Sequence, residues 1–136
     1  MSRALLLLLL TCPLLQAEES LVVVVNQQSP IQQLSREDLS ALYLGNLMAR
    51  EATHGLRALD LTDGEARDSF YTYLLGRSRN QMRAYWSRMV FTGKGKPPRA
   101  LDAEAIIEAL QNDPNLIGYL PSGQLPSSLR PVLNLP

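Results

Sequence analysis

The stretch LRALDLTDGEARDSFYTYLL (Leu56–Leu75) joins an apolar run to a helical pattern through a short polar turn. Leu56–Leu61 has the length and composition of a short strand. Phe70 and Leu74 recur at helical spacing after it, which predicts a helix from about Gly64. The order strand, turn, helix is typical of α/β proteins.

The turn inside this stretch carries a glycine, two acidic residues and an arginine, and it has two interpretations. The N–H groups that open a helix form a ready anion site, and Gly64 with Arg67 could complete it. Alternatively, Asp63 as helix cap and Glu65 in the first turn supply the negative charge themselves, and Arg67 pairs with them. Asp60 and Asp68 lie nearby, but the spacing is not that of a metal-binding loop.

Outward from this stretch, apolar runs and helical patterns continue to alternate. LVVVVN (Leu21–Asn26) is apolar and β-branched throughout, which indicates a strand buried on both faces. Leu116–Leu120 predicts a further strand, and Pro131–Leu135 an edge strand. Ser35, Ser78 and Asp102 stand before helical patterns as caps, whereas residues 46–55 and 91–99 are expected to be loops. The fold class is therefore α/β, with a small mixed sheet of about three or four strands and helices on both faces.

The N-terminus has the pattern of a secretory signal peptide. Arg3 precedes the apolar core Leu5–Leu10, and Ala17 is a small residue suited to a cleavage site. The domain division is then a signal peptide over residues 1–17 and one domain over residues 18–136. Cys12, the only cysteine, lies in the segment to be removed, although lipid attachment there is an alternative. The secreted domain would contain no disulfide and no cysteine metal site.

Charge and motifs exclude several classes of function. Cleavage removes one of the 13 basic residues and leaves 12 against 13 acidic ones, so nothing favours bulk nucleic-acid binding. His54, the only histidine, falls in a polar loop and is expected to be solvated. No zinc-protease, nucleophile-elbow or P-loop motif occurs. We therefore expect a protein that is not an enzyme and holds no metal or cofactor.

Two basic segments follow the central helix. Lys94 and Lys96 lie in a glycine-rich loop that is either solvated or close to a ligand. RNQMRAYWSRMVF mixes arginines with aromatic residues, as some nucleic-acid binders do. Helical spacing instead places Met82, Trp86 and Met89 on one stripe, which favours core packing.

Taken in order, several segments resemble the periplasmic phosphate-binding proteins of ABC transporters. They are SPIQQLSREDLSALYLGN, DGEARDSFYTYLLGRS, QMRAYWSRMVFTGKGKPP and NLIGYLP. The chain is most similar to the short, single-lobe phosphate-transporter substrate-binding-like proteins of Gram-negative bacteria. The resemblance covers about Val22 to Leu120.

This resemblance implies a single lobe of the type II periplasmic-binding-protein-like fold in the periplasm. It also implies a non-catalytic binding function, with weak binding of phosphate or a related oxyanion by Ser29, Gly64, Arg67 and Lys94. Glu65 and Ala66 stand where the family has hydroxyl donors. The alternative is a structural or interaction module that keeps the fold without the ligand and acts through a periplasmic protein partner or membrane complex.

The signal-peptide pattern predicts that the exported protein begins at or close to Glu18. Intact-mass analysis of the protein from the periplasm of a Gram-negative host checks this. A soluble cytoplasmic product that retains Met1 would contradict it.

Overall fold

The computed structural model describes residues 20–46 and 51–136, so the predicted signal peptide lies outside the described residues. The elements follow in the order β1 (Leu21–Asn26), α1 (Arg36–Tyr43), β2 (Arg57–Leu61), α2 (Glu65–Leu75), α3 (Arg79–Phe91), β3 (Arg99–Leu101), α4 (Ala103–Asn112), β4 (Leu116–Pro121), the 3-10 turn η2 (Ser122–Gln124) and β5 (Leu129–Leu135).

The strands form one mixed sheet in the order β3-β2-β4-β1-β5. β2 runs parallel to both of its neighbours, β3 and β4. β1 runs antiparallel to β4 and to β5. Leu21–Val25 are buried without interruption, as predicted for a strand covered on both faces.

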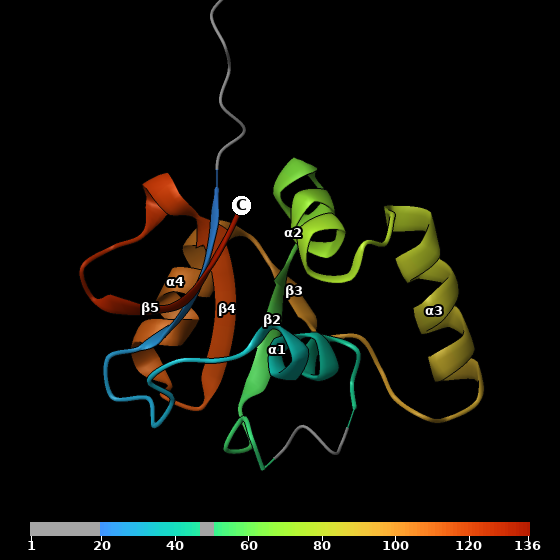
Figure 1. Ribbon diagram of the computed structural model, residues 1–136, viewed down its shortest axis with the longest axis horizontal. Helices are drawn as coiled ribbons and strands as arrows, with labels where there is room; N and C mark the ends of the chain where they lie inside the picture. Colours follow the sequence, from blue (N-terminus) through green and yellow to red (C-terminus); the bar gives the residue numbers. More distant parts are fainter. Residues whose placement is uncertain (1–19, 47–50) are drawn as a thin grey trace, which may run out of the picture.

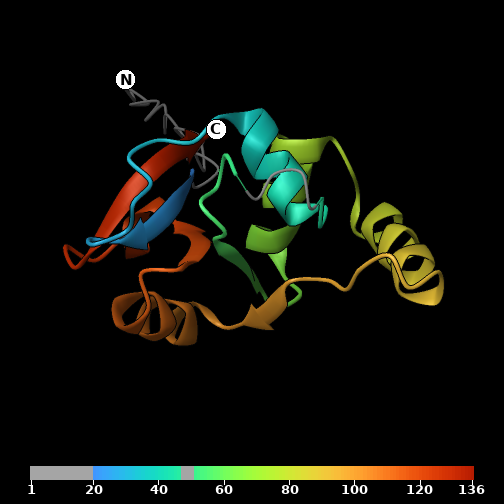
Figure 2. The same cartoon turned by 90° about the horizontal axis from the view of Figure 1, so that it is seen from below.

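Helices cover both faces of this sheet, which confirms the predicted fold class. α4 packs against β1, β2 and β4, whereas α1 and α2 contact β2 and each other. Figures 1 and 2 show α4 on one side of the sheet and α1 with α2 on the other. α3 stands apart from the sheet, beyond the edge strand β3, in both views.

The sheet has five strands, whereas three or four were predicted, because the short strand β3 was not recognised in the sequence. Arg99–Leu101 pairs in parallel with Leu59–Leu61 and directly follows two prolines. Three residues carry no alternation that sequence reasoning can detect, and the pairing depends on β2 being present. The predicted edge strand at Pro131–Leu135 exists and begins two residues earlier, at Leu129.

The predicted caps Ser35, Ser78 and Asp102 are present at the starts of α1, α3 and α4. The N–H groups of Asp38, Gln81 and Ala105 donate to the caps Ser35, Ser78 and Asp102. His54 is exposed, as expected. Met82 and Trp86 are buried, and Met89 packs partly buried against the core, so the apolar stripe is confirmed. In the described part of the chain, no helix is long and apolar enough to cross a membrane.

Gly118 lets α4 approach the sheet closely. A Cβ at this position would lie 3.1 Å from Cγ2 of Ile106 and 3.5 Å from Cδ1 of Leu110, both on α4. The first distance is shorter than ordinary van der Waals contact, so any larger residue must push the helix outward.

We therefore expect Gly118→Ala to lower the free energy of unfolding by about 1–3 kcal/mol, and Gly118→Val to lower it further. Urea denaturation measures the change. Gly95→Ala is the matched control, because its Cβ would meet the flexible end of Met89 at 3.4 Å and Cζ3 of Trp86 at 3.9 Å, an ordinary van der Waals distance. Equal stability of Gly118→Val and wild type would contradict this account of the packing.

Candidate functional site

The candidate site lies where β2 ends and α2 begins. A Cβ at Gly118 would point toward Ile106 and Leu110 of α4 and would lie 3.9 Å from Cβ of Leu59. The side chain of Leu59 therefore lies on the face of the sheet that α4 covers. Because side chains alternate along a strand, Asp60 points to the opposite face, toward α2. Its side chain has a relative exposure of only 1%.

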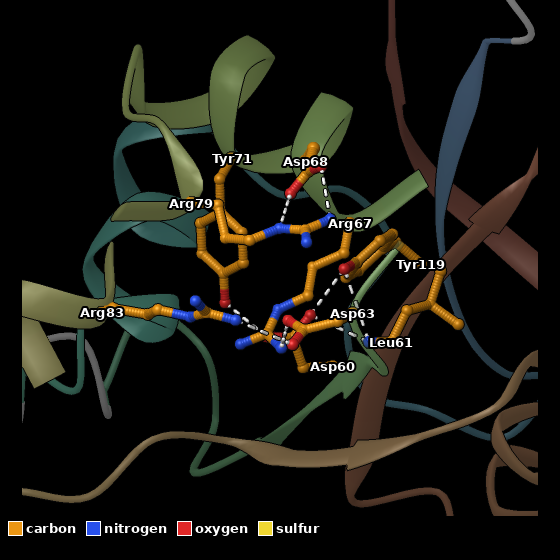
Figure 3. Close-up of polar contacts among 9 residues, drawn as sticks. All are labelled: Asp60, Leu61, Asp63, Arg67, Asp68, Tyr71, Arg79, Arg83 and Tyr119. Atoms are coloured by element: carbon orange, nitrogen blue, oxygen red, sulfur yellow. Dashed lines mark hydrogen bonds and ion pairs between the residues drawn. The ribbon is translucent and has the colours of Figure 1, made fainter. Parts of the chain in front are cut away.

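Asp60 is buried with a full set of polar partners. The hydroxyl groups of Tyr71 and Tyr119 donate to its carboxylate at 2.6 Å and 2.5 Å. The backbone N–H of Leu61 donates to the same carboxylate at 2.8 Å. Figure 3 shows the two tyrosines reaching Asp60 from α2 and β4, so one carboxylate joins three elements. A buried carboxylate needs such partners, since its isolated burial is strongly unfavourable.

The environment of Asp60 shifts its pKa in a definite direction. Burial raises the pKa of the Asp60 carboxyl above its usual value, and this effect outweighs the opposing hydrogen bonds from Tyr119 and Tyr71 and the charge of Arg67. Burial also raises the pKa values of Tyr71 and Tyr119, and the nearby negative charge of Asp60 adds to the increase. Both tyrosines are therefore neutral donors at physiological pH.

Arg67, in the first turn of α2, contacts two carboxylates. Its Nε lies 3.3 Å from Oδ2 of Asp60, and its Nη1 lies 2.9 Å from Oδ1 of Asp63. The guanidinium also lies 5.9 Å from the ring centroid of Tyr71. Figure 3 shows the Arg67 side chain directed toward both aspartates. The ion pair with Asp63 that the sequence suggested is confirmed, and Asp60 adds a second, buried one.

The start of α2 differs from the prediction in one respect. Asp63 does not cap the helix: the N-cap is Gly64, and no side chain accepts from the N–H groups there. The physical reason is that Asp63 is engaged by two arginines, Arg67 at 2.9 Å and Arg83 at 3.3 Å. Glu65 is exposed in the first turn. The backbone N–H groups at this helix start are therefore left without a side-chain cap.

An ion pair connects α2 to α3 beside a groove that lies between the two helices. Arg79 and Asp68 form a two-pronged pair at 2.7 Å and 2.9 Å. The groove, which we call the α2–α3 groove, has a volume of about 670 Å³. Charged residues line it from both sides (Asp63, Arg67 and Asp68; Arg79 and Arg83 of α3), and α3 adds apolar ones (Met82, Trp86, Val90, Phe91).

Ser29, one of the four predicted ligand residues, lies far from this turn. It follows β1, which runs antiparallel to β4, whereas β2 runs parallel to β4. The C-terminal ends of β1 and β2 therefore lie at opposite ends of the strands of the sheet, as Figure 1 shows. Ser29 is buried in a turn of its own, where its Oγ accepts from the N–H of Ile31 at 3.3 Å. The structure does not bring Ser29 to Arg67.

Lys94, also predicted, belongs to a different surface. It follows α3 and lines a separate groove with Gly45, Tyr85 and Met89. Only Gly64 and Arg67 of the four predicted residues therefore meet at one place. The sequence analysis named Asp60 but missed its role as a buried carboxylate bound by Tyr71 and Tyr119. The available signal was a charged residue inside an apolar strand, between Leu59 and Leu61.

The chemistry of this site is that of charge-assisted hydrogen bonding. His54 precedes β2, at the strand end opposite to Asp60, so it cannot assist there. Within residues 20–46 and 51–136, no group of three or more histidine, cysteine or acidic residues could hold a metal ion.

Because the pKa of Asp60 is raised in the folded protein, its contribution to the free energy of unfolding depends on pH. Between the ordinary aspartate value of about 3.9 and the folded value, the folded state binds more protons than the unfolded state. Asp60 therefore stabilises the fold most at low pH, and this contribution is lost as pH rises through its folded pKa.

Asp60→Asn removes this titration but keeps the shape of the side chain. We expect the stability of the variant relative to wild type to increase as pH rises through the folded pKa, as measured by urea denaturation across the acidic range. The carboxyl carbon resonance of Asp60 should titrate above the ordinary value. A resonance that titrates below it, with the opposite trend in relative stability, would show that the pairing outweighs burial.

Comparisons with known proteins support the fold. No family model and no curated protein matches the sequence. The solved structures that match the fold include two crystal structures with a TM-score of 0.62 each. One is an ABC-type phosphate transport receptor from Vibrio cholerae, at 18% identity over 83% of this chain and 45% of that chain. The other is a putative phosphate ABC transporter substrate-binding protein with bound phosphate from Clostridium perfringens, at 16% identity over 83% of this chain and 44% of that chain.

These matches confirm the predicted resemblance at the level of the fold. The chain spans less than half the length of either receptor that it matches. It therefore has the α/β fold of part of a phosphate-transporter substrate-binding protein.

Proposed function

We propose that the chain is a secreted, non-catalytic binding module of the periplasm that binds phosphate or a related oxyanion weakly at the turn between β2 and α2. The observation that carries this proposal is the position of Arg67 in the first turn of a helix whose N-terminus has no side-chain cap. Uncapped N–H groups and a guanidinium together form an anion site.

The fold supports the choice of ligand class. The two solved structures compared above are described as a phosphate transport receptor and a putative phosphate transporter substrate-binding protein, and the second contains phosphate. Both are more than twice as long as the part that this chain matches. A binding site closed between two bodies excludes water and strengthens each charge-assisted hydrogen bond. Among the described residues the side chain of Asp63 at this turn is 50% exposed, so the turn is open to solvent, which weakens an anion site.

The carboxylates at the turn explain why the expected affinity is low. Asp63 contacts Nη1 of Arg67 at 2.9 Å and is itself half-exposed, so it occupies the place where an oxyanion would meet the guanidinium. Asp60 holds Nε of the same arginine from the buried side. A phosphate must displace Asp63 or share Arg67 with it, against the repulsion of like charges.

A second candidate function is a protein-interaction module that keeps the fold without an anion ligand. The observation that favours it is the pair of large apolar side chains on α3, with Val90 56% and Phe91 92% exposed. Large exposed apolar side chains are a frequent mark of protein interfaces.

Isothermal titration calorimetry with phosphate tests the first proposal. Wild type should bind no more tightly than the millimolar range. Asp63→Asn should increase the affinity about tenfold, the effect of one charge-assisted hydrogen bond. The double variant Asp63→Asn with Arg67→Ala should lose this gain, because the released guanidinium is then absent.

Asp113→Asn is the matched control, since it changes the net charge equally and removes the ion pair of Asp113 with Arg57. It should leave phosphate affinity unchanged. Micromolar binding by wild type would show that Arg67 is freely available, which contradicts the role given to Asp63. No binding by wild type or by Asp63→Asn would overturn the oxyanion proposal and favour the interaction module.

A further inference from the structure

Trp86 combines burial with an unsatisfied polar atom. Its side chain lines the α2–α3 groove, and the residue has a relative exposure of only 7%. Its indole Nε1 is the buried side-chain polar atom for which the described residues provide no hydrogen-bond partner. A buried N–H without an acceptor is unfavourable, so each such case in a folded protein requires an explanation.

The neighbours of Trp86 indicate where this N–H group lies. A Cβ at Gly45 would lie 3.2 Å from Cη2 of the ring, and a Cβ at Gly95 would lie 3.9 Å from Cζ3. The six-membered ring is therefore held beside these glycines, and Nε1 belongs to the five-membered ring at the other end. The α2–α3 groove includes Trp86 but neither glycine in its lining, so it meets the indole away from these glycines, and we infer that Nε1 lies beneath the floor of the groove.

The same groove carries the largest exposed apolar side chains of the described residues. Phe91 is 92% exposed and Val90 is 56% exposed, and both line the groove beside Met82. Such residues are the usual anchors of protein interfaces. α3 stands apart from the sheet in Figure 2, and the exposure of Val90 and Phe91 leaves this face accessible to another molecule.

Charge indicates the chemistry of the occupant. From residue 69 to residue 101 the sequence contains seven basic residues and no acidic one. Ion pairs within the described chain involve only Arg79 and Arg83 of these seven. Arg88 and Lys96 are exposed, have no ion pair among the described residues, and are the sequence neighbours of Ser87 and Pro97 in the groove lining. Electrostatic complementarity therefore favours an acidic partner.

We propose that the α2–α3 groove is a docking site for an acidic peptide segment of another protein. An apolar side chain of the segment packs against Phe91 and Val90, and a carbonyl or carboxylate oxygen accepts the hydrogen bond from Nε1 of Trp86. The surrounding basic residues attract the acidic residues of the segment. Arg67 also lines the groove, but the proposal does not depend on phosphate binding, because the contacts that it assigns are made by Trp86, Val90 and Phe91.

A membrane surface explains the exposed apolar and basic residues less well. An anionic lipid headgroup would meet the cations of the loop, but it would not reach the buried N–H group of Trp86. A narrow, extended peptide can enter the groove and supply an acceptor there. We therefore favour the peptide and treat the membrane as an outcome that the experiment detects.

A random peptide library displayed on phage is the probe, with selection on wild type and counter-selection on Phe91→Ser. Phe91 is almost fully exposed, so its replacement leaves the fold intact. Selected sequences should combine acidic residues with an aromatic or large aliphatic one. Synthetic peptides of these sequences should bind Phe91→Ser at least about tenfold more weakly, whereas Phe91→Leu should retain most of the affinity.

Trp86 reports on the groove directly, because it is the only tryptophan in the chain. Its single indole N–H resonance should shift downfield when a selected peptide is added. Trp86→Phe keeps an aromatic ring but removes the donor, so it should weaken binding roughly three- to tenfold, as measured by calorimetry. Added salt should weaken binding as well.

Other outcomes would overturn the proposal. They are the absence of any selected peptide, the selection of basic peptides, and binding that Phe91→Ser leaves unchanged. Phe91-dependent binding to phosphatidylglycerol vesicles without peptide binding would assign the surface to a membrane. Phe91-dependent dimerisation in analytical ultracentrifugation would assign it to a second copy of the chain.

Discussion

The structure around the candidate site depends on one buried carboxylate. Asp60 receives hydrogen bonds from Tyr71 on α2 and Tyr119 on β4 and lies against the guanidinium of Arg67. Removing any one partner leaves a buried charge less well compensated, which destabilises a protein strongly. The position of α2 over the sheet and the direction of its first turn are therefore linked through Asp60.

Aromatic packing beneath this network makes the arrangement rigid. Phe70 stacks on Tyr119 with ring centroids 3.7 Å apart, and Tyr43 meets Phe70 edge-on at 4.7 Å. The hydroxyl of Tyr43 donates to the carbonyl of Leu59, the residue before Asp60. Because these rings pack between α1, α2 and the sheet, they hold the tyrosine hydroxyls against Asp60. The packing of these rings therefore fixes the position of Asp60, toward which the guanidinium of Arg67 is directed.

The sequence predicts much of the fold because its strongest signals are local. The buried run Leu21–Val25, the caps Ser35, Ser78 and Asp102, and the stripe of Met82 and Trp86 are each explained by neighbouring residues. β3 escaped detection because its three residues become a strand only by pairing with β2.

The candidate site was harder to predict, because its geometry depends on the order and direction of distant strands. Arg67 and Gly64 meet because they are neighbours in sequence. Ser29 does not join them, because β1 runs antiparallel to β4, whereas β2 runs parallel to it. The C-terminal end of β1 therefore lies at the opposite end of the sheet from that of β2. Tyr119 reaches Asp60 across 59 positions of sequence, a contact that no local pattern contains.

The central claim is that Arg67 acts first as the partner of buried Asp60. A double-mutant cycle with Asp60→Asn and Arg67→Met, measured by urea denaturation at neutral pH, tests it most directly. The account predicts a favourable coupling free energy of at least about 1 kcal/mol, within the range found for residues in contact. A coupling near zero, with additive effects of the two substitutions, would contradict it.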